Sequence, residues 1–391
     1  MSYYTCPYCF TKVNPSDIWF QCAVQSCVQQ DEVRTRYELD IEPSQKCPQP
    51  YRNYNTFFRG QSRDVGECPK CQHQTSIRVC ANCHSAFPSG IEGLSNTIIA
   101  VVGARETGKS HYIAVLIQIL KQLNVKFDWT ISALNDETID VYRRVFFEPL
   151  YLKNSPLLQT KGAAHNTDVK KPLLYSLHLH SVNKIVILAF FDSAGEDLEN
   201  VDNMKRVNKY IASASGIILL LDPLLVPSIR SKIHTDNLPD EKIIAYHIHI
   251  IDILSNFLRT QNKYDLKQEY PIPLAVTFSK IDLLRQMMGE EFDRFTTPIH
   301  HKKNILNLDS LETNGDFIKN WLITNAPELL NGTQRFTKHQ FFGISTLGSD
   351  PRILGSTTNP DGRIIPGGVK PMHVEDPFLW LLYANNLIPG R

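Results

Sequence analysis

The chain has 391 residues, of which 42% are hydrophobic and 21% are charged, and its formal net charge is +1. These values are typical of a globular protein, and the balanced charge excludes a strong field that would recruit nucleic acid or an acidic membrane. No apolar run approaches the ~18 residues that a membrane helix needs, so we expect no transmembrane segment. Residues 1–10 lack the apolar core of a signal peptide, which predicts a cytoplasmic location.

All nine cysteines precede residue 84, and this shift in composition predicts a domain boundary near residue 90. We therefore expect a cysteine-rich zinc-binding region over residues 1–90 and a second domain over residues 91–391. In a reducing cytoplasm, paired cysteines are more often metal ligands than disulfides. Between the cysteine pairs, the alternating residues 34–42 predict a strand.

Eight cysteines form four short pairs, which are Cys6 with Cys9, Cys22 with Cys27, Cys68 with Cys71, and Cys80 with Cys83. A CxxC turn presents two thiolates on one edge of a loop, and two such turns complete a closed tetrahedral zinc site. Neighbours along the chain then predict one four-cysteine site from the first two pairs and another from the last two. We expect two Zn²⁺ ions, with Cys47 as either a buried thiol or a replacement ligand in the first site.

The zinc modules have two interpretations. Zinc stabilises modules that are too small to build their own core, and such modules often serve as protein-contact surfaces. Nucleic-acid binding is the alternative, but residues 1–90 hold nine Lys and Arg against eight Asp and Glu. Because the basic footprint is missing, we expect protein partners and no nucleic acid.

The second domain opens with a β-branched run, residues 97–102, that leads into the sequence GARETGKS. A strand, a GxxxxGKS loop and helix-like spacing predict a phosphate-binding loop whose N–H groups and helix dipole hold phosphate oxygens. Lys109 is expected to reach the β and γ phosphates, and Ser110 to ligate Mg²⁺. The residues expected to contact nucleotide here are Gly103, Arg105, Glu106, Thr107, Gly108, Lys109, Ser110 and His111.

A continuous apolar run over residues 185–191 predicts a central strand, and it ends in the sequence DSAGE. Asp192 is placed to complete the Mg²⁺ shell with Ser110, and Gly195 allows its N–H to approach the γ-phosphate. Glu196 follows as the candidate to position the attacking water.

Two segments precede this strand. The alternating residues 173–180 predict a half-exposed strand at a sheet edge. Residues 155–171 have few apolar side chains and no periodicity, which is typical of a mobile switch. Thr160, with Thr167 as the alternative, is expected to close over the γ-phosphate and Mg²⁺.

Two later loops predict which base is bound. Asp282, in the sequence SKID, can accept both the ring N–H and the exocyclic amine of guanine, a donor pair that adenine lacks. Lys280 can lay its methylene stem along the base, and the backbone N–H groups near Ser345 and Thr346, in the sequence STLG, can donate to the guanine carbonyl. Buried polar recognition of this kind discriminates strongly, so we expect GTP and GDP.

The motifs GARETGKS, DSAGED, SKID and STLG, in this order, resemble those of Ras-like, translation-factor-related P-loop GTPases. Together with the CPYC and CANC turns, the arrangement is similar to bacterial double-GTPase-type proteins that carry an N-terminal zinc-ribbon region. The resemblance implies an α/β fold with a mostly parallel sheet and one antiparallel edge strand, and it implies work in conflict or defence systems.

Four positions depart from the Ras-like pattern. Ser279 stands where Asn or Thr is usual, which predicts a looser base loop. Glu196 replaces a water-orienting glutamine, and Arg105 with Glu106 adds bulk that can block an arginine finger from a partner.

Our first hypothesis is a regulatory GTPase that is slow alone and switches a protein partner, with oligomerisation left open. The alternatives are a non-hydrolysing guanine-nucleotide sensor and an ATPase, which SKID and STLG argue against. The glycine- and proline-rich residues 348–371 predict either a surface loop or a lid or docking arm. A final helix is expected near residues 377–387.

Overall fold

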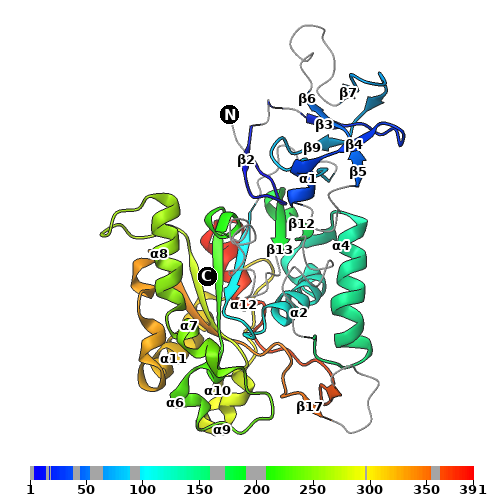
Figure 1. Cartoon of the computed structure of the whole chain (residues 1–391). Helices are drawn as coiled ribbons and strands as arrows, with labels where there is room; N and C mark the ends of the chain where they lie inside the picture. The colour runs from blue at the N-terminus through cyan, green and yellow to red at the C-terminus, as the bar shows by residue number, and fades with distance from the viewer. Residues whose placement is uncertain are drawn as a thin grey trace.

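The computed structural model describes residues 4–14, 17, 19–37, 45–52, 65–88, 97–158, 172–190, 208–295, 297–353 and 362–391. The predicted site residues outside these ranges are Thr160, Thr167, Asp192, Gly195 and Glu196. In Figure 1 the N-terminal region, in blue, lies at one end of the molecule, and strand β17 (Arg352–Ile353) lies at the opposite end. Within the described ranges, no helix combines the length and the apolarity needed to span a membrane.

A four-stranded parallel sheet forms the centre of the chain that follows the cysteine-rich region. Its hydrogen-bonded order is β10 (Ile99–Gly103), β14 (Gly216–Leu221), β15 (Leu274–Phe278) and β16 (His339–Gly343). Every residue of β14 and β15 is buried, as expected for continuous apolar strands that are covered on both faces. The mostly parallel α/β fold is therefore confirmed.

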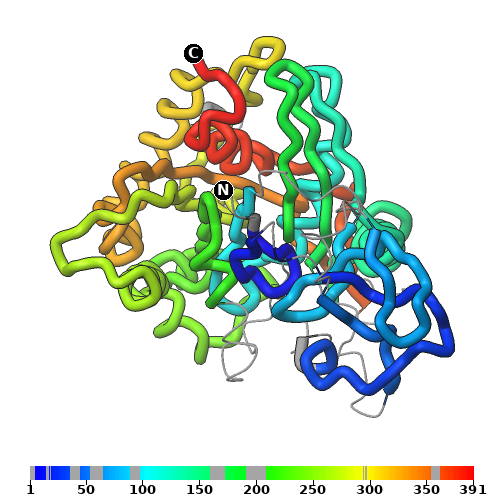
Figure 2. Tube along the Cα trace, turned by 90° about the horizontal axis from the view of Figure 1, so that it is seen from above, coloured from blue at the N-terminus to red at the C-terminus, as the bar shows by residue number. Residues whose placement is uncertain are grey.

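Helices cover both faces of this sheet. Successive side chains of a strand point to opposite faces, so neighbouring residues of one strand pack against different helices. Ile217 and Leu219 pack in one hydrophobic cluster with α8 and α11. Ile218 and Leu220 pack in a second cluster with α2 and α12. These helices are α2 (Lys109–Gln122), α8 (Ile250–Asn262), α11 (Leu308–Asn325) and α12 (Asp376–Ala384). Figure 2 shows the blue N-terminal region and the red C-terminal helix on different sides of the central strands.

A second sheet is antiparallel, with the order β11 (Trp129–Ala133), β12 (Leu173–Leu179) and β13 (Lys184–Phe190). The prediction of an edge strand over residues 173–180 is wrong, because β12 pairs on both sides and β11 covers the flank that the sequence pattern left open. The run predicted as a central strand over residues 185–191 forms β13 over its described part, but β13 lies at one end of its three-stranded sheet, so the predicted central position is wrong. Residues of β13 also contact β10, so the two sheets adjoin beside the phosphate-loop strand.

Two other sequence expectations differ from the structure. Residues 32–37 form helix α1 (Glu32–Tyr37), so the strand predicted over residues 34–42 is wrong in its described part. The carboxylate of Asp31 accepts a hydrogen bond from the Arg34 N–H at 3.0 Å, and this N-cap favours the helix. The apolar spacing of residues 240–258 predicts one helix, but the structure has three pieces there, namely the 3₁₀ turn Glu241–Ile243, α7 (Ile244–Ile248) and α8.

Shorter elements complete the second domain. They are α3 (Asn124–Phe127), α4 (Asp136–Val141), the π-helix Tyr142–Leu152, the 3₁₀ turns His180–Val182, Pro223–Leu225, Ile281–Leu284, Pro327–Leu330 and Thr333–Arg335, α6 (Pro227–Arg230), α9 (Arg285–Met288), α10 (Glu291–Phe295) and β18 (Arg363–Ile364).

The N-terminal region is built from short strand pairs. They are β1 (Tyr4–Thr5) with β2 (Lys12–Val13), β3 (Trp19–Gln21) with both β6 (Pro50–Arg52) and β9 (Arg78–Val79), β4 (Val28–Gln30) with β5 (Lys46–Pro48), and β7 (Gly66–Glu67) with β8 (Gln74–Thr75). The β3–β9 pairing brings residues near 20 beside residues near 80, which are far apart in the sequence.

The N-terminal region packs directly on the second domain. The rings of Phe10 and Tyr210 lie 5.0 Å apart, and the Ser213 hydroxyl donates to the Phe10 carbonyl at 2.9 Å. The Tyr210 hydroxyl in turn donates to the carbonyl of Ile99, in the first strand of the parallel sheet, at 2.9 Å. A continuous set of contacts therefore connects the cysteine-rich region to the strand that ends in the phosphate loop.

Candidate nucleotide site and cysteine clusters

The loop between β10 and α2 has the backbone of a phosphate-binding loop. Gly108 has φ +90°, with nothing within 4 Å of a Cβ built on it, so glycine is needed there for its conformation. Helix α2 begins at the next residue, Lys109. The Lys109 ammonium donates to the carbonyls of Gly103 at 3.0 Å and Ala104 at 2.9 Å, which places a positive charge inside the loop.

A cavity of about 450 Å³ opens between the phosphate loop and the loops after β15 and β16. Because the strands are parallel, the loops at their carboxyl ends meet at one edge of the sheet. The predicted residues that line the cavity are Arg105, Glu106, Thr107, Gly108, Lys109, Ser110, His111, Lys280, Asp282, Ser345 and Thr346. Gly103 is not among the lining residues, and a Cβ there would meet the Thr107 hydroxyl at 2.6 Å.

Asp282 lies in a short 3₁₀ turn, Ile281–Leu284, that follows Lys280 in a left-handed conformation. Burial raises the pKa of Asp282, and the Ser345 hydroxyl partly offsets this rise. The N–H of Ser345 donates to the Met372 carbonyl at 3.0 Å. Of the two donors that the sequence suggests for a guanine carbonyl, the N–H of Thr346 is therefore the better candidate.

Ser279 connects the base loop to the phosphate loop despite its small size. Its hydroxyl oxygen lies 3.1 Å from the Thr107 carbonyl and 3.1 Å from the Leu221 carbonyl, and its N–H donates to Leu221 at 2.8 Å. These contacts join the ends of β14 and β15 to the phosphate loop, so a serine at this position keeps the base loop fixed rather than loosening it.

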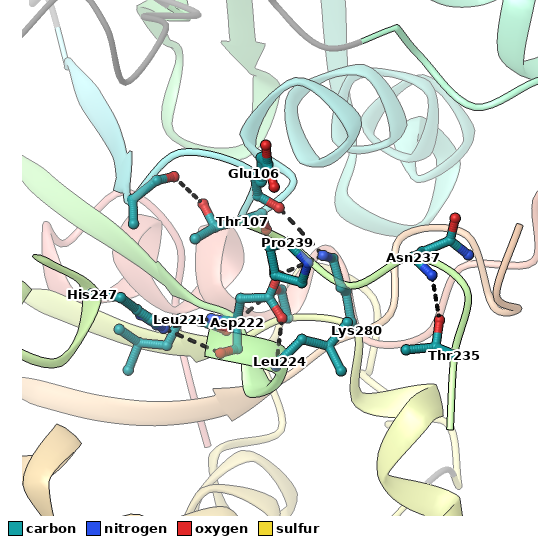
Figure 3. Close-up of polar contacts among 12 residues, drawn as sticks. Glu106, Thr107, Leu221, Asp222, Leu224, Thr235, Asn237, Pro239, His247 and Lys280 are labelled. Carbon is teal, nitrogen blue, oxygen red and sulfur yellow. Dashed lines mark hydrogen bonds and ion pairs between the residues drawn. The ribbon is translucent and has the colours of Figure 1, made fainter. Parts of the chain in front are cut away.

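Asp222 is a site residue that the sequence reasoning missed. It directly follows β14, its side chain is fully buried, and one carboxylate oxygen lies 2.5 Å from the Lys280 ammonium. The same ammonium donates to the Glu106 carbonyl in the phosphate loop at 3.3 Å, as Figure 3 shows. An acidic residue at the carboxyl end of a buried parallel strand was the available signal.

Residues 234–240, here called the latch segment, were also missed. Asp350 accepts hydrogen bonds from the Thr235 hydroxyl at 2.6 Å and the Asn237 amide at 2.7 Å. At the other end, the Asp240 N–H donates to the Glu106 carboxylate at 3.2 Å. Asn237, with two neighbouring residues of the segment, lines the cavity, so the latch segment joins the phosphate loop to the region beyond β16.

His111 has a more specific place than the sequence suggested. Its Nε2 accepts a hydrogen bond from the Leu157 N–H at 3.0 Å, at the start of the predicted switch. Burial, followed by the nearby Lys280 charge, lowers the pKa of His111 to about 4. The imidazole is therefore neutral at pH 7 and can keep accepting this bond.

The described part of the segment 348–371 packs on the base loop. Lys370 N–H donates to the Leu347 carbonyl at 2.9 Å, and a Cβ on Gly348 would overlap the Lys370 carbonyl oxygen. This close approach, together with φ +79°, explains why glycine stands at position 348. Residues 370–372 therefore hold the base loop in place rather than forming a separate surface loop.

The cysteines form two tetrads, but not in the predicted pairing. One tetrad is Cys6, Cys9, Cys80 and Cys83, and the other is Cys22, Cys27, Cys68 and Cys71. The prediction that neighbouring pairs share a metal is wrong, because the β3–β9 pairing folds the last pair back onto the first. Cys47 belongs to neither tetrad, so its predicted alternative as a replacement ligand is also wrong.

The sulfur positions fit zinc. The measured Sγ–Sγ separations are 3.8 Å for Cys6–Cys83 and Cys9–Cys80, and 3.5 and 3.7 Å for Cys22–Cys71 and Cys27–Cys68. A tetrahedron with Zn–S bonds of about 2.3 Å has sulfurs about 3.8 Å apart, whereas a disulfide needs about 2.0 Å. The four-thiolate donor sets therefore fit two structural Zn²⁺ ions.

The turns around the cysteines support the same conclusion. The residue directly after three of the pairs has a left-handed backbone, with φ 56° at Phe10, 58° at Gln72 and 57° at His84. Each of these residues donates its N–H to the carbonyl of the first cysteine of its pair, at 2.8 to 2.9 Å. This repeated turn aims both thiols of a pair at one point.

Comparison with known proteins identifies the family. The sequence pattern of the family described as Double-GTPase 2 matches residues 97–314, which is more than half of the chain. The chain belongs to the Double-GTPase 2 family. The matched stretch runs from β10 into α11 and includes the phosphate loop and the SKID loop. The double-GTPase resemblance of the sequence motifs is thus confirmed.

A relative of this Double-GTPase 2 chain is SaeC of Mycolicibacterium smegmatis, whose name proposes a role in ESX-1 scaffolding and assembly. It is 30% identical over 290 residues, which is 73% of this chain and 72% of SaeC. Among solved structures, the GTP-bound Ski7 GTPase-like domain of S. cerevisiae is 15% identical with a TM-score of 0.34, over 74% of this chain and 50% of that chain. The Arl6 BBS3 small GTPase of Trypanosoma brucei is 12% identical with a TM-score of 0.27, over 75% and 99%.

Proposed function

We propose that this protein is a GTP-binding switch that acts on protein partners and hydrolyses GTP slowly on its own. The observation that carries the proposal is that Lys109 in the phosphate loop and Asp282 in the base loop line one cavity. A group that holds phosphates and a group that accepts the guanine donor pair therefore face the same ligand, and Lys280 lies between them.

The chemistry assigns a role to each group. Lys109 binds phosphate oxygens through its ammonium, and Ser110 would hold Mg²⁺ together with Asp192. Mg²⁺, when bound, neutralises charge that develops on the phosphates. We further propose that Thr160 closes over the γ-phosphate and that Glu196 orients the attacking water.

Slow turnover follows from the identity of Glu196. An ionised carboxylate accepts hydrogen bonds but cannot donate one, and its charge beside a triphosphate is unfavourable. An arginine finger from a partner is worth about 10³ to 10⁵ in rate for this reaction class. We expect a GTP turnover rate of about 10⁻² per second or less without a partner. If the parent protein shows no GTP hydrolysis, the alternative of a guanine-nucleotide sensor is favoured.

Protein partners are supported from two sides. The name of SaeC proposes scaffolding and assembly, and the zinc-fitting region of this chain has a balanced charge that lacks the basic footprint of a nucleic-acid-binding module. We propose that GTP and GDP states differ in their affinity for a partner in the cytoplasm, within a larger assembly. A conflict or defence setting is the form of assembly that the sequence resemblance suggests.

Nucleotide selectivity tests the proposal. We expect the parent protein to bind GTP in preference to ATP, and Lys109→Ala to lose tight binding of either. Asp282→Asn should weaken GTP binding about 100-fold or more, because guanine donors lose their acceptor, and should favour xanthosine triphosphate. Fluorescent-nucleotide titration measures all three, with the exposed surface variant Asp265→Asn as the matched control. A parent protein that prefers ATP would support the ATPase alternative instead.

A further inference from the structure

Asp222 has both carboxylate oxygens engaged inside the protein. One accepts the Leu224 N–H at 2.8 Å, and the other lies 2.5 Å from the Lys280 ammonium. The side chain has no exposed surface. Burying a carboxylate costs free energy unless a cation and hydrogen bonds compensate its charge. The Lys280 ammonium therefore compensates the buried charge of Asp222, and Asp222 in turn holds the Lys280 side chain in place.

The backbone of Asp222 is held from the opposite side. The imidazole Nε2 of His247, which is also buried, lies 3.1 Å from the Asp222 N and 3.2 Å from its carbonyl oxygen. Figure 3 shows His247 and Lys280 on either side of Asp222. The carboxylate is thereby fixed relative to the end of β14.

Lys280 connects the fixed carboxylate of Asp222 to the cavity. Its backbone is left-handed, its side chain is 30% exposed, and its ammonium lies between Asp222 and the Glu106 carbonyl. With the ammonium held at the base of the phosphate loop, the methylene stem is fixed along the cavity wall. An unrestrained lysine would have to lose rotamer freedom when the nucleotide binds.

We propose that Asp222 is a positioning residue for guanine-nucleotide binding, which acts by holding the Lys280 side chain against the phosphate loop before the nucleotide arrives. The inference rests on the proposed GTP binding and adds to it a residue that the recognition motifs do not contain. Asp222 does not touch the nucleotide, so its effect passes through Lys280.

A double-mutant cycle tests this coupling. Asp222→Asn keeps the size of the side chain and an oxygen for the Leu224 N–H, but it removes the charge that holds Lys280. We expect GTP affinity to fall about tenfold or more in Asp222→Asn, the scale of one charged hydrogen bond. The GTP affinity of Lys280→Met should fall at least as far. The double variant Asp222→Asn/Lys280→Met should bind GTP no more weakly than Lys280→Met alone. Asp309→Asn, an exposed acid in the first turn of α11, is the matched control.

Two outcomes would overturn the inference. Unchanged GTP affinity in Asp222→Asn would contradict the inference. If the two substitutions lower the GTP affinity independently and additively in the double variant, Asp222 acts through the fold and not through Lys280. Thermal unfolding checks each variant, and if Asp222→Asn does not fold, the comparison of Lys280→Met with the double variant decides. The double variant should then be more stable than Lys280→Met, because it no longer buries an unpaired carboxylate. If the double variant binds GTP more weakly than Lys280→Met does, the inference is contradicted. If the parent protein fails to prefer GTP, the proposed function fails first, which separates the two results.

Discussion

Two histidines, the buried His247 and the half-buried His111, lie close to Lys280. Burial lowers the pKa of His247 to about 4, as it does for His111, and the Lys280 charge acts in the same direction on both rings. Neutral imidazoles can accept hydrogen bonds, which His111 does from Leu157. At the residue scale, therefore, the site depends on side chains that remain uncharged near neutrality.

This state predicts an acid-sensitive fold. An unfolded histidine has a pKa of about 6.5, so between pH 6.5 and about 4 the unfolded chain binds more protons than the folded one. The free energy of unfolding should then fall on acidification through this window, by up to about 1.4 kcal/mol per pH unit for each histidine. The full stabilisation should be present above pH 6.5.

Urea unfolding at several pH values measures the effect. His111→Gln should flatten the pH dependence between 6.5 and 4 relative to the parent protein. Equal slopes for the parent protein and His111→Gln would show that His111 does not titrate in this window.

At the scale of elements, the latch segment joins parts of the site that lie far apart in sequence. The Asn237 amide donates to the Asp350 carboxylate at 2.7 Å and to the Pro351 carbonyl at 2.6 Å. The Glu106 carboxylate holds the other end through Asp240. The segment thus covers one side of the cavity and is fixed at both of its ends.

Loss of this fixation should speed nucleotide release. Asn237→Ala removes two hydrogen bonds, each worth about 1 kcal/mol, so we expect the dissociation rate of GTP to rise by up to about thirtyfold with little change in association. Stopped-flow displacement of a fluorescent nucleotide measures this rate. Asn320→Ala, on an exposed part of α11, is the control, and an unaltered rate in Asn237→Ala would mean that the segment does not retain the nucleotide.

At the scale of the whole molecule, the two cysteine tetrads have different surroundings. The tetrad of Cys6, Cys9, Cys80 and Cys83 belongs to the same hydrophobic cluster as the parallel sheet. In the other tetrad, Cys22, Cys27 and Cys68 form a separate small cluster with Phe20 and Tyr51, and Cys71 is exposed. The first metal site is therefore part of the core of the nucleotide domain, and the second stabilises only its own module.

Metal loss should then have unequal effects. We expect Cys6→Ser/Cys9→Ser to lower the melting temperature of the nucleotide domain by roughly 5–10 °C, or about 2–3 kcal/mol in a domain of this size, because Phe10 loses its fixed position on Tyr210. Cys22→Ser/Cys27→Ser serves as the matched control and should leave that transition nearly unchanged. Calorimetry together with zinc analysis checks both, and equal shifts would contradict the distinction.

The sequence by itself determined the family and the motif residues of the two loops that line the cavity. The phosphate loop and the SKID loop could be read because a short motif fixes its own backbone through glycine and directly follows a buried apolar strand. The parallel sheet could be read from its continuous apolar runs. Thr160, Asp192 and Glu196 stay predictions, since they lie outside the described residues.

Only the tertiary structure decided which cysteines share a metal and which residues support the base loop. Cys6 meets Cys83 because β3 pairs with β9, and strand pairing between distant segments leaves no trace in local spacing. Asp222 and Lys280 follow neighbouring strands but are 58 positions apart. An isolated acid or lysine is by default a solvated side chain, and the ion pair exists because the parallel strands end side by side at one edge of the sheet.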